Sequence, residues 1–140
     1  MAALNWFNCA MKDVLSGKHN FKDIAYKLML SNVAPVLTNT LSTDITEISA
    51  GNGYSAGGPI LTLNTVETFN TSSGRVIFAD QSITASGGTI ATFRYGVIYN
   101  SVNLSLVGYI DIGGTVSLPN GQFFMFDMDQ VNGLMQLSLG

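Results

Sequence analysis

The side chains that most often carry catalysis are scarce in this sequence, which contains one histidine, His19, and one cysteine, Cys9. A catalytic histidine needs a nucleophile or a carboxylate within reach, and no sequence neighbour of His19 supplies one. We therefore interpret His19 as an exposed loop residue. Cys9 lies among apolar residues, so we interpret it as a small buried hydrophobe rather than a reactive thiolate. One cysteine and one histidine cannot fill a tetrahedral zinc site, and we expect no catalytic residue, no metal and no cofactor.

Asp127 and Asp129 are separated by one residue, which on a strand places both carboxylates on the same side. Such a pair could ligate a hard cation such as calcium. Two carboxylates alone are a weak signal for a metal site, and Asn132-Gly133 immediately afterwards is the strongest short hairpin signal in the chain. We therefore interpret the acidic pair as the solvated end of a strand.

Two further patterns could bind ligands. Gly51-Asn52-Gly53 resembles part of a phosphate cradle, but neither the Gly-Lys-Ser/Thr continuation nor a following helix is present. The aromatic residues Phe93, Tyr95 and Tyr99 could form a stacking platform for sugars or bases. At alternating positions of one strand they are more often core residues or cross-strand pairs, and this is the interpretation that we favour.

The elements that must position these residues are mostly short strands. Apolar spacing over residues 4–16 predicts a short amphipathic helix or hook, whereas residues 21–30 alternate as a strand does. After Pro59, further strands follow at the spacing typical of sandwiches and barrels, among them Arg75 to Ala85, Thr89 to Asn100 and Leu104 to Ile112, the last broken by Gly113-Gly114. The sequence therefore predicts an all-β protein, an antiparallel β-sandwich of jelly-roll type with a short N-terminal helix or hook. We divide it into a hook or arm at 1–20 and a β-sandwich domain at 21–140.

Charged residues make up only 11% of the 140 residues, against about 25% in an average soluble domain. A surface so poor in charge indicates either a protein that lives in an assembly or a β-domain with a neutral, hydroxyl-rich and amide-rich exterior. All four lysines fall in the first 27 residues, which carry a net charge of +2, and the remainder carries −5. An acidic body argues against nucleic-acid binding.

Targeting signals are weak throughout the sequence. No apolar run reaches the length of a membrane span, so no membrane partner is expected. The apolar N-terminus lacks a preceding positive region and makes a poor signal peptide. The single cysteine is atypical of an oxidised secreted domain. We expect a protein made in the cytoplasm.

The stretch from Asp44 to Gly58 is the seam between the two halves of the chain. Asp44 stands in capping position with Glu47 three residues later, which predicts a helix start, but only one apolar turn follows. The glycines after it free the backbone to adopt positive φ angles, and Tyr54 is the only large side chain among them. Long glycine-rich loops are usually functional or mobile.

Four stretches together resemble a family of small proteins from tailed bacteriophages. They are L-S-N-V-A-P-V-L-T-N-T (Leu30 to Thr40), D-I-T-E-I-S-A-G-N-G-Y-S-A-G-G (Asp44 to Gly58), F-A-D-Q-S-I-T-A-S-G-G-T-I (Phe78 to Ile90) and F-R-Y-G-V-I-Y-N (Phe93 to Asn100). The resemblance implies a head decoration (cement) protein, a jelly-roll-like sandwich on the outside of an icosahedral capsid. The implied partner is the major capsid protein, and the implied location is the virion. Symmetric assembly further favours a homo-oligomer, either a dimer or a trimer.

Aromatic residues are frequent interface anchors, which suggests where such a protein would touch its neighbours. Our hypothesis is that Trp6 and Phe7 anchor the N-terminal hook in a neighbour's groove, and that Asn52, Gly53 and Tyr54 form a second contact. The alternative for Trp6 is that it covers its own sandwich.

Other functions remain open at this level. A phage tail or neck component would resemble a head protein closely, and a carbohydrate-binding sandwich on the virion surface is a second class. An enzyme is the least favoured, because no catalytic constellation is visible.

Overall fold

The computed structural model describes residues 4–70, 73–128 and 135–138. Within these residues the chain forms antiparallel strands, one short α-helix and one 3₁₀ turn, so the all-β prediction is confirmed. The jelly-roll connectivity stays a prediction. Asp129 and the Asn132-Gly133 turn lie outside the described residues.

A four-stranded antiparallel sheet forms the centre of the protein. Its strands, in spatial order, are β1 (Leu4–Trp6), β7 (Leu106–Leu118), β6 (Ile90–Asn100) and β2 (Tyr26–Ser31). The two central strands, β6 and β7, are also the longest, so this sheet is organised around one long hairpin.

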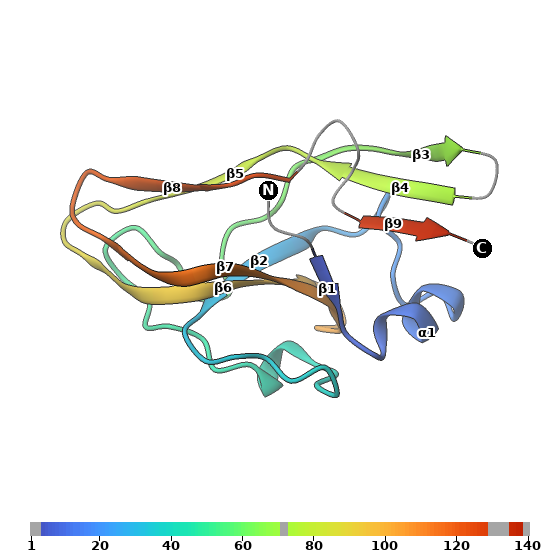
Figure 1. Ribbon diagram of the computed structural model, residues 1–140, viewed down its shortest axis with the longest axis horizontal. Coiled ribbons are helices and arrows are strands. Elements are labelled where there is room, and N and C mark those ends of the chain that lie inside the picture. Colours follow the sequence, from blue (N-terminus) through green and yellow to red (C-terminus); the bar gives the residue numbers. More distant parts are fainter. Residues whose placement is uncertain (1–3, 71–72, 129–134, 139–140) are drawn as a thin grey trace.

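A second layer lies across from this sheet (Figure 1). It consists of a three-stranded sheet of β3 (Leu63–Asn70), β4 (Ser73–Phe78) and β9 (Met135–Ser138), and a two-stranded sheet of β5 (Gln81–Thr84) and β8 (Phe123–Phe126). Buried side chains from both layers, among them Leu28, Ile98, Phe78 and Phe126, form one hydrophobic core. The two layers therefore pack as a β-sandwich.

The other face of the four-stranded sheet is also covered. Met29, Val97 and Leu106 point away from the sandwich core and form a second buried cluster with Phe7 and Ile45. In Figure 1 the loop between β2 and β3, which includes the 3₁₀ turn η1 (Ser42–Asp44), runs beneath this sheet. As a result β6 is buried on both faces along most of its length rather than on alternate residues only.

The N-terminal segment differs from the helix expected over residues 4–16. Residues 4–6 form β1, which pairs with β7 in the register Leu4↔Ile110, and only Ala10–Leu15 form the helix α1. Trp6 lies opposite Gly108, where an added side chain would meet the backbone of Asn5. The first strand thus belongs to the main sheet, although a three-residue strand is too short to produce a recognisable alternation.

Two expected strand boundaries are also corrected. The strand expected over Arg75 to Ala85 is divided between β4 and β5, with Asp80 between them accepting a hydrogen bond from the Met128 N–H at 2.8 Å. Conversely, β7 continues through Gly113-Gly114, where a break was expected. An irregularity in the pairing with β6 absorbs the two glycines there.

Candidate functional site

Tyr54, the large residue of the glycine-rich loop, is a buried anchor. Its side chain is 3% exposed, and its hydroxyl accepts the Leu30 N–H at 3.0 Å and donates to Glu47 Oε2 at 2.6 Å. Burial, reinforced by the neighbouring carboxylate, raises the pKa of Tyr54 far above its usual value. The hydroxyl therefore stays protonated and holds the loop against the edge of β2.

Glu47 holds a second residue of the same loop in addition to Tyr54. Its carboxylate also accepts the Gly57 N–H at 2.5 Å, and the Tyr99 hydroxyl donates to the Gly57 carbonyl at 2.7 Å. The capping role predicted for Asp44 and Glu47 at the start of a helix is wrong. Asp44 ends η1, and its carboxylate accepts the N–H groups of Thr40 and Leu41, which lowers its pKa.

The glycines of this loop are required by close packing. Gly53 (φ 102°) and Gly58 (φ 79°) both adopt left-handed backbone conformations, and an added Cβ would collide with the carbonyl oxygens of Thr84 and Leu28 respectively. Asn52, at φ 57°, donates its side-chain amide to the Thr89 carbonyl at 2.8 Å. The conspicuous A-G-N-G-Y motif is thus explained by packing within this chain.

The residues proposed as partner contacts fall into two groups. Phe7 and Tyr54 are 2% and 3% exposed, so their side chains contact this chain's own core. Trp6 is partly buried against the sandwich core, and Asn52 and Gly53 are exposed. Only the last three have surface left for a partner, and their contact role stays a prediction.

His19 is buried, which corrects the expectation of an exposed loop histidine. Its Nε2 lies 3.2 Å from the Leu106 carbonyl and its Nδ1 lies 3.2 Å from the Tyr26 hydroxyl. Because a carbonyl can only accept, Nε2 carries the proton and Nδ1 accepts from Tyr26. Burial lowers the pKa of His19 and raises the pKa of Tyr26 to about 12. The two nitrogens therefore fasten the N-terminal segment to two strands, Nε2 to β7 and Nδ1 to β2.

Neither Cys9 nor Asp13 forms a reactive centre. The Cys9 thiol lies 3.7 Å from the Asn39 carbonyl, and burial followed by the nearby Asp13 charge raises its pKa, which disfavours a thiolate. Asp13 is buried, and its Oδ1 lies 3.9 Å from Lys18 Nζ. Among the described residues, no group of three or more histidine, cysteine or acidic residues could hold a metal ion.

The aromatic residues considered as a stacking platform are buried. Phe93, Tyr95 and Tyr99 are exposed by 0%, 9% and 4%, so the favoured interpretation as core residues is confirmed. Phe93 faces the sandwich core and Tyr99 faces the second cluster, because the β6–β7 pairing is irregular between them.

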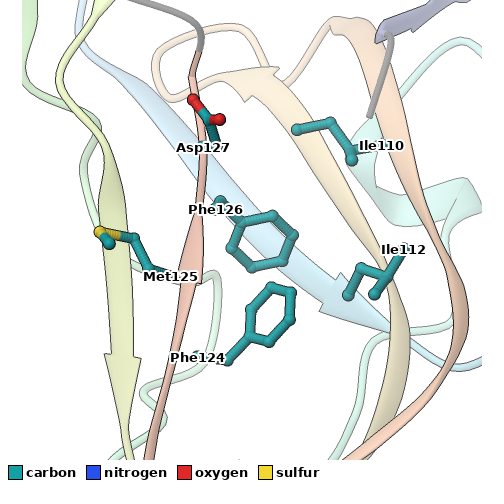
Figure 2. Close-up of a pocket in the computed structure, with 6 residues that line it drawn as sticks. All are labelled: Ile110, Ile112, Phe124, Met125, Phe126 and Asp127. Atoms are coloured by element: carbon teal, nitrogen blue, oxygen red, sulfur yellow. The ribbon is translucent and has the colours of Figure 1, made fainter. Parts of the chain in front are cut away.

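An apolar cavity of about 310 Å³ opens between β7 and β8. In Figure 2 the rings of Phe124 and Phe126 point from β8 toward Ile110 and Ile112 on β7. Asp127 supplies the one charged side chain among the residues that line it. Ligand sites usually combine an apolar lining with several converging polar groups, so this cavity offers little chemistry.

The structure also has an exposed apolar surface that was not expected from the sequence. Six apolar side chains, each between 38% and 57% exposed, belong to three neighbouring segments. We call this surface the apolar underside, and its members are Met11, Val33, Val36, Leu37, Leu41 and Leu104. Hydrogen bonds from the Asn8 N–H to the Leu37 carbonyl and from the Ser42 N–H to the Leu104 carbonyl connect the segments. The spacing of these residues follows no single strand or helix, so no sequence periodicity reveals them.

Family models, curated proteins and solved structures were compared with this chain, and none matches it. The phage-protein resemblance of the four stretches between Leu30 and Asn100 therefore stays a prediction. The described residues include no helix that is long and apolar enough to span a membrane.

Proposed function

We propose that this protein is a structural virion component, a decoration protein that binds the outside of a phage head and stabilises the lattice of the major capsid protein. The observation that carries the proposal is the apolar underside, because exposed apolar patches rimmed by polar groups mark protein–protein contacts. The resemblance of the four stretches between Leu30 and Asn100 to phage head proteins suggests the partner. A tail or neck location is the alternative within the same class.

The charges of the β-sandwich are compatible with this role. Arg75 pairs with Glu67 at 2.6 Å and Arg94 pairs with Asp111 at 2.8 Å, so both arginines are neutralised within their own sheets. A surface of this kind can approach another protein with few charges to desolvate, which suits a large protein contact.

Binding to purified shells tests the proposal. The protein would be mixed with undecorated shells of the major capsid protein encoded in the same genome, and sedimentation would measure the bound fraction. Saturable, stoichiometric binding supports decoration. Binding to tails but not to shells would move the protein to the tail or neck, and retention on a glycan column without shell binding would replace the proposal with a carbohydrate-binding role.

A further inference from the structure

Strand β8 has a backbone edge that faces away from its partner strand. Among the described strands it pairs only with β5, and just before this pairing begins the Ala85 N–H donates to the Gln122 carbonyl at 2.8 Å. The bonding direction alternates along an antiparallel strand, so the backbone of Phe124 faces β5. The N–H and C=O groups of Phe123 and Met125 therefore face away from β5, in the direction from which another strand could add.

The side chains of β8 are apolar on both faces of the strand. Figure 2 shows Met125 pointing away from the rings of Phe124 and Phe126, which belong to the interior of the sandwich. On the outer face Phe123 is 63% exposed and Met125 is 51% exposed. Neither β8 nor β5 contains a charged residue or a proline, and their pairing is regular throughout. Charges, prolines and bulges are the usual means by which a protein prevents strand addition at an edge, and β8 has none of them.

Two other outer strands of the molecule are protected in these ways. The loop after the glycine-rich stretch covers the edge of β2, where the Leu28 N–H donates to the Pro59 carbonyl at 3.0 Å and the Leu61 N–H to the Tyr26 carbonyl at 2.8 Å. Strand β3 carries the charge of Glu67, and its pairing with β4 is irregular near both ends. The open edge of β8 is therefore a local exception in a fold that otherwise protects its edges.

The charges at the ends of β8 and the order of its side chains indicate which strand adds. Asp80 and Asp127 follow the same end of the β5–β8 pair, so a parallel copy of β8 would bring the acids of two chains together. An antiparallel copy related by a two-fold axis through Phe124 places them at opposite ends. The same axis sets Phe123 opposite Met125 of the second copy, an aromatic ring against a thioether. A lipid or a small apolar ligand would leave the outward N–H and C=O groups unsatisfied.

We infer that β8 pairs antiparallel with β8 of a second copy of this chain, so that one sheet in the order β5-β8-β8-β5 crosses the two-fold axis. The free backbone groups of Phe123 and Met125 are satisfied by this pairing, and their exposed side chains are covered by each other. The inference does not rest on the proposed function. It uses none of the residues of the apolar underside, so a dimer formed in this way keeps that surface available.

Sedimentation velocity of the full chain over a series of concentrations tests the inference. The wild type should pass from monomer to dimer as its concentration rises. Phe123→Lys and Met125→Glu should each weaken self-association at least about tenfold, because a charge on an edge strand opposes strand addition. Val66→Lys is the matched control, since Val66 is 47% exposed on β3, and it should dimerise as the wild type does.

An equimolar mixture of the Phe123→Lys and Met125→Glu variants is the decisive measurement. In the inferred register the introduced lysine of one copy faces the introduced glutamate of the other, whereas the second pair keeps the original phenylalanine and methionine. The mixture should therefore dimerise about as tightly as the wild type, although neither variant does so alone.

Each other outcome overturns the inference. A wild type that stays monomeric up to its solubility limit excludes a second copy as the partner. If both variants dimerise as tightly as the wild type, the dimer uses another surface. If both variants keep the wild-type melting temperature at low concentration and their mixture stays monomeric, the antiparallel register about Phe124 is wrong. Binding to shells takes no part in these measurements, so the proposed function stands or fails separately.

Discussion

Two of the regions that hold residues at positive φ, the glycine-rich loop and the turn at Leu104, follow opposite rules. In the loop from Asn52 to Gly58, glycine or asparagine occupies these positions, and an added Cβ at Gly53 or Gly58 would strike another strand. At Leu104, a branched side chain occupies a conformation that glycine would adopt more easily. In the first region the residue types suit the backbone conformation, and in the second region the residue type does not.

This contrast shows that the stretch that stands out most in the sequence is not the one best suited to contact another molecule. The glycine-rich loop stands out in the sequence, yet Tyr54, Glu47 and Gly57 explain it as an internal fastening. Leu104 is inconspicuous in the sequence and gains meaning only from its φ angle and its exposure. A residue whose identity the fold does not require is the better candidate for a contact with another molecule.

The largest expected effect comes from filling the space at Gly58. Gly58→Ala should destabilise the protein by about 3 kcal/mol, because the new methyl group collides with the Leu28 carbonyl in addition to the backbone strain. Gly87→Ala is the matched control, since Gly87 has φ 83° but open space around it, and it should cost only about 1 kcal/mol. Urea denaturation of both variants measures the difference, and equal losses would contradict the packing explanation.

The next effect concerns the Tyr54 anchor. Tyr54→Phe should destabilise the protein by about 2 kcal/mol, because it removes the partner of the Leu30 N–H and one donor to Glu47. Tyr109→Phe is the control, because it removes a hydroxyl from a tyrosine that is only half-buried. Chemical denaturation gives both values, and a loss no larger than the control's would remove the anchor role from the hydroxyl.

A smaller effect of opposite sign is expected at the second region. Leu104→Gly should leave the free energy of unfolding unchanged or raise it by up to about 1 kcal/mol, because the backbone strain is relieved. Thermal unfolding of the isolated protein measures this change without any partner. A clear destabilisation would mean that the leucine side chain supports the fold, and the contrast between the two regions would disappear.

The smallest effect is a pH dependence from His19. Burial lowers its folded pKa below the ordinary 6.5, so the unfolded chain binds the proton more readily. The stability from neutral His19 is complete above about pH 6.5 and is lost as the pH falls toward the folded pKa, by an amount set by the difference between the folded and unfolded pKa values. Denaturation at several pH values should show this slope in the wild type and not in His19→Gln. The same slope in both proteins would assign it to other groups.

Much of the fold could be predicted because alternation identifies strands one at a time. The strand over Thr89 to Asn100 is found at nearly its true bounds, as β6. Its second buried face was missed, because the covering loop that contains Ile45 has no regular pattern of its own. The register irregularity beyond Phe93 also escaped prediction, since it depends on the partner strand.

The candidate site was far less predictable. Aromatic side chains were chosen as contacts on the general rule for interfaces, and the fold uses Phe7 and Tyr54 internally instead. His19 was misjudged because its partners, Tyr26 and Leu106, come from two separate strands. A patch assembled from three segments has no linear signature, and Leu104 is recognised only from its backbone angle.

Because β1 pairs with β7, the four-stranded sheet can be complete only after both strands have been synthesised. Leu4 finds its partner at Ile110, more than a hundred residues downstream. During synthesis β1 must therefore wait for the whole intervening segment, up to β7, before it can pair. Closing this long-range pairing costs loop entropy, so it should slow folding more than it changes the stability of the finished sheet.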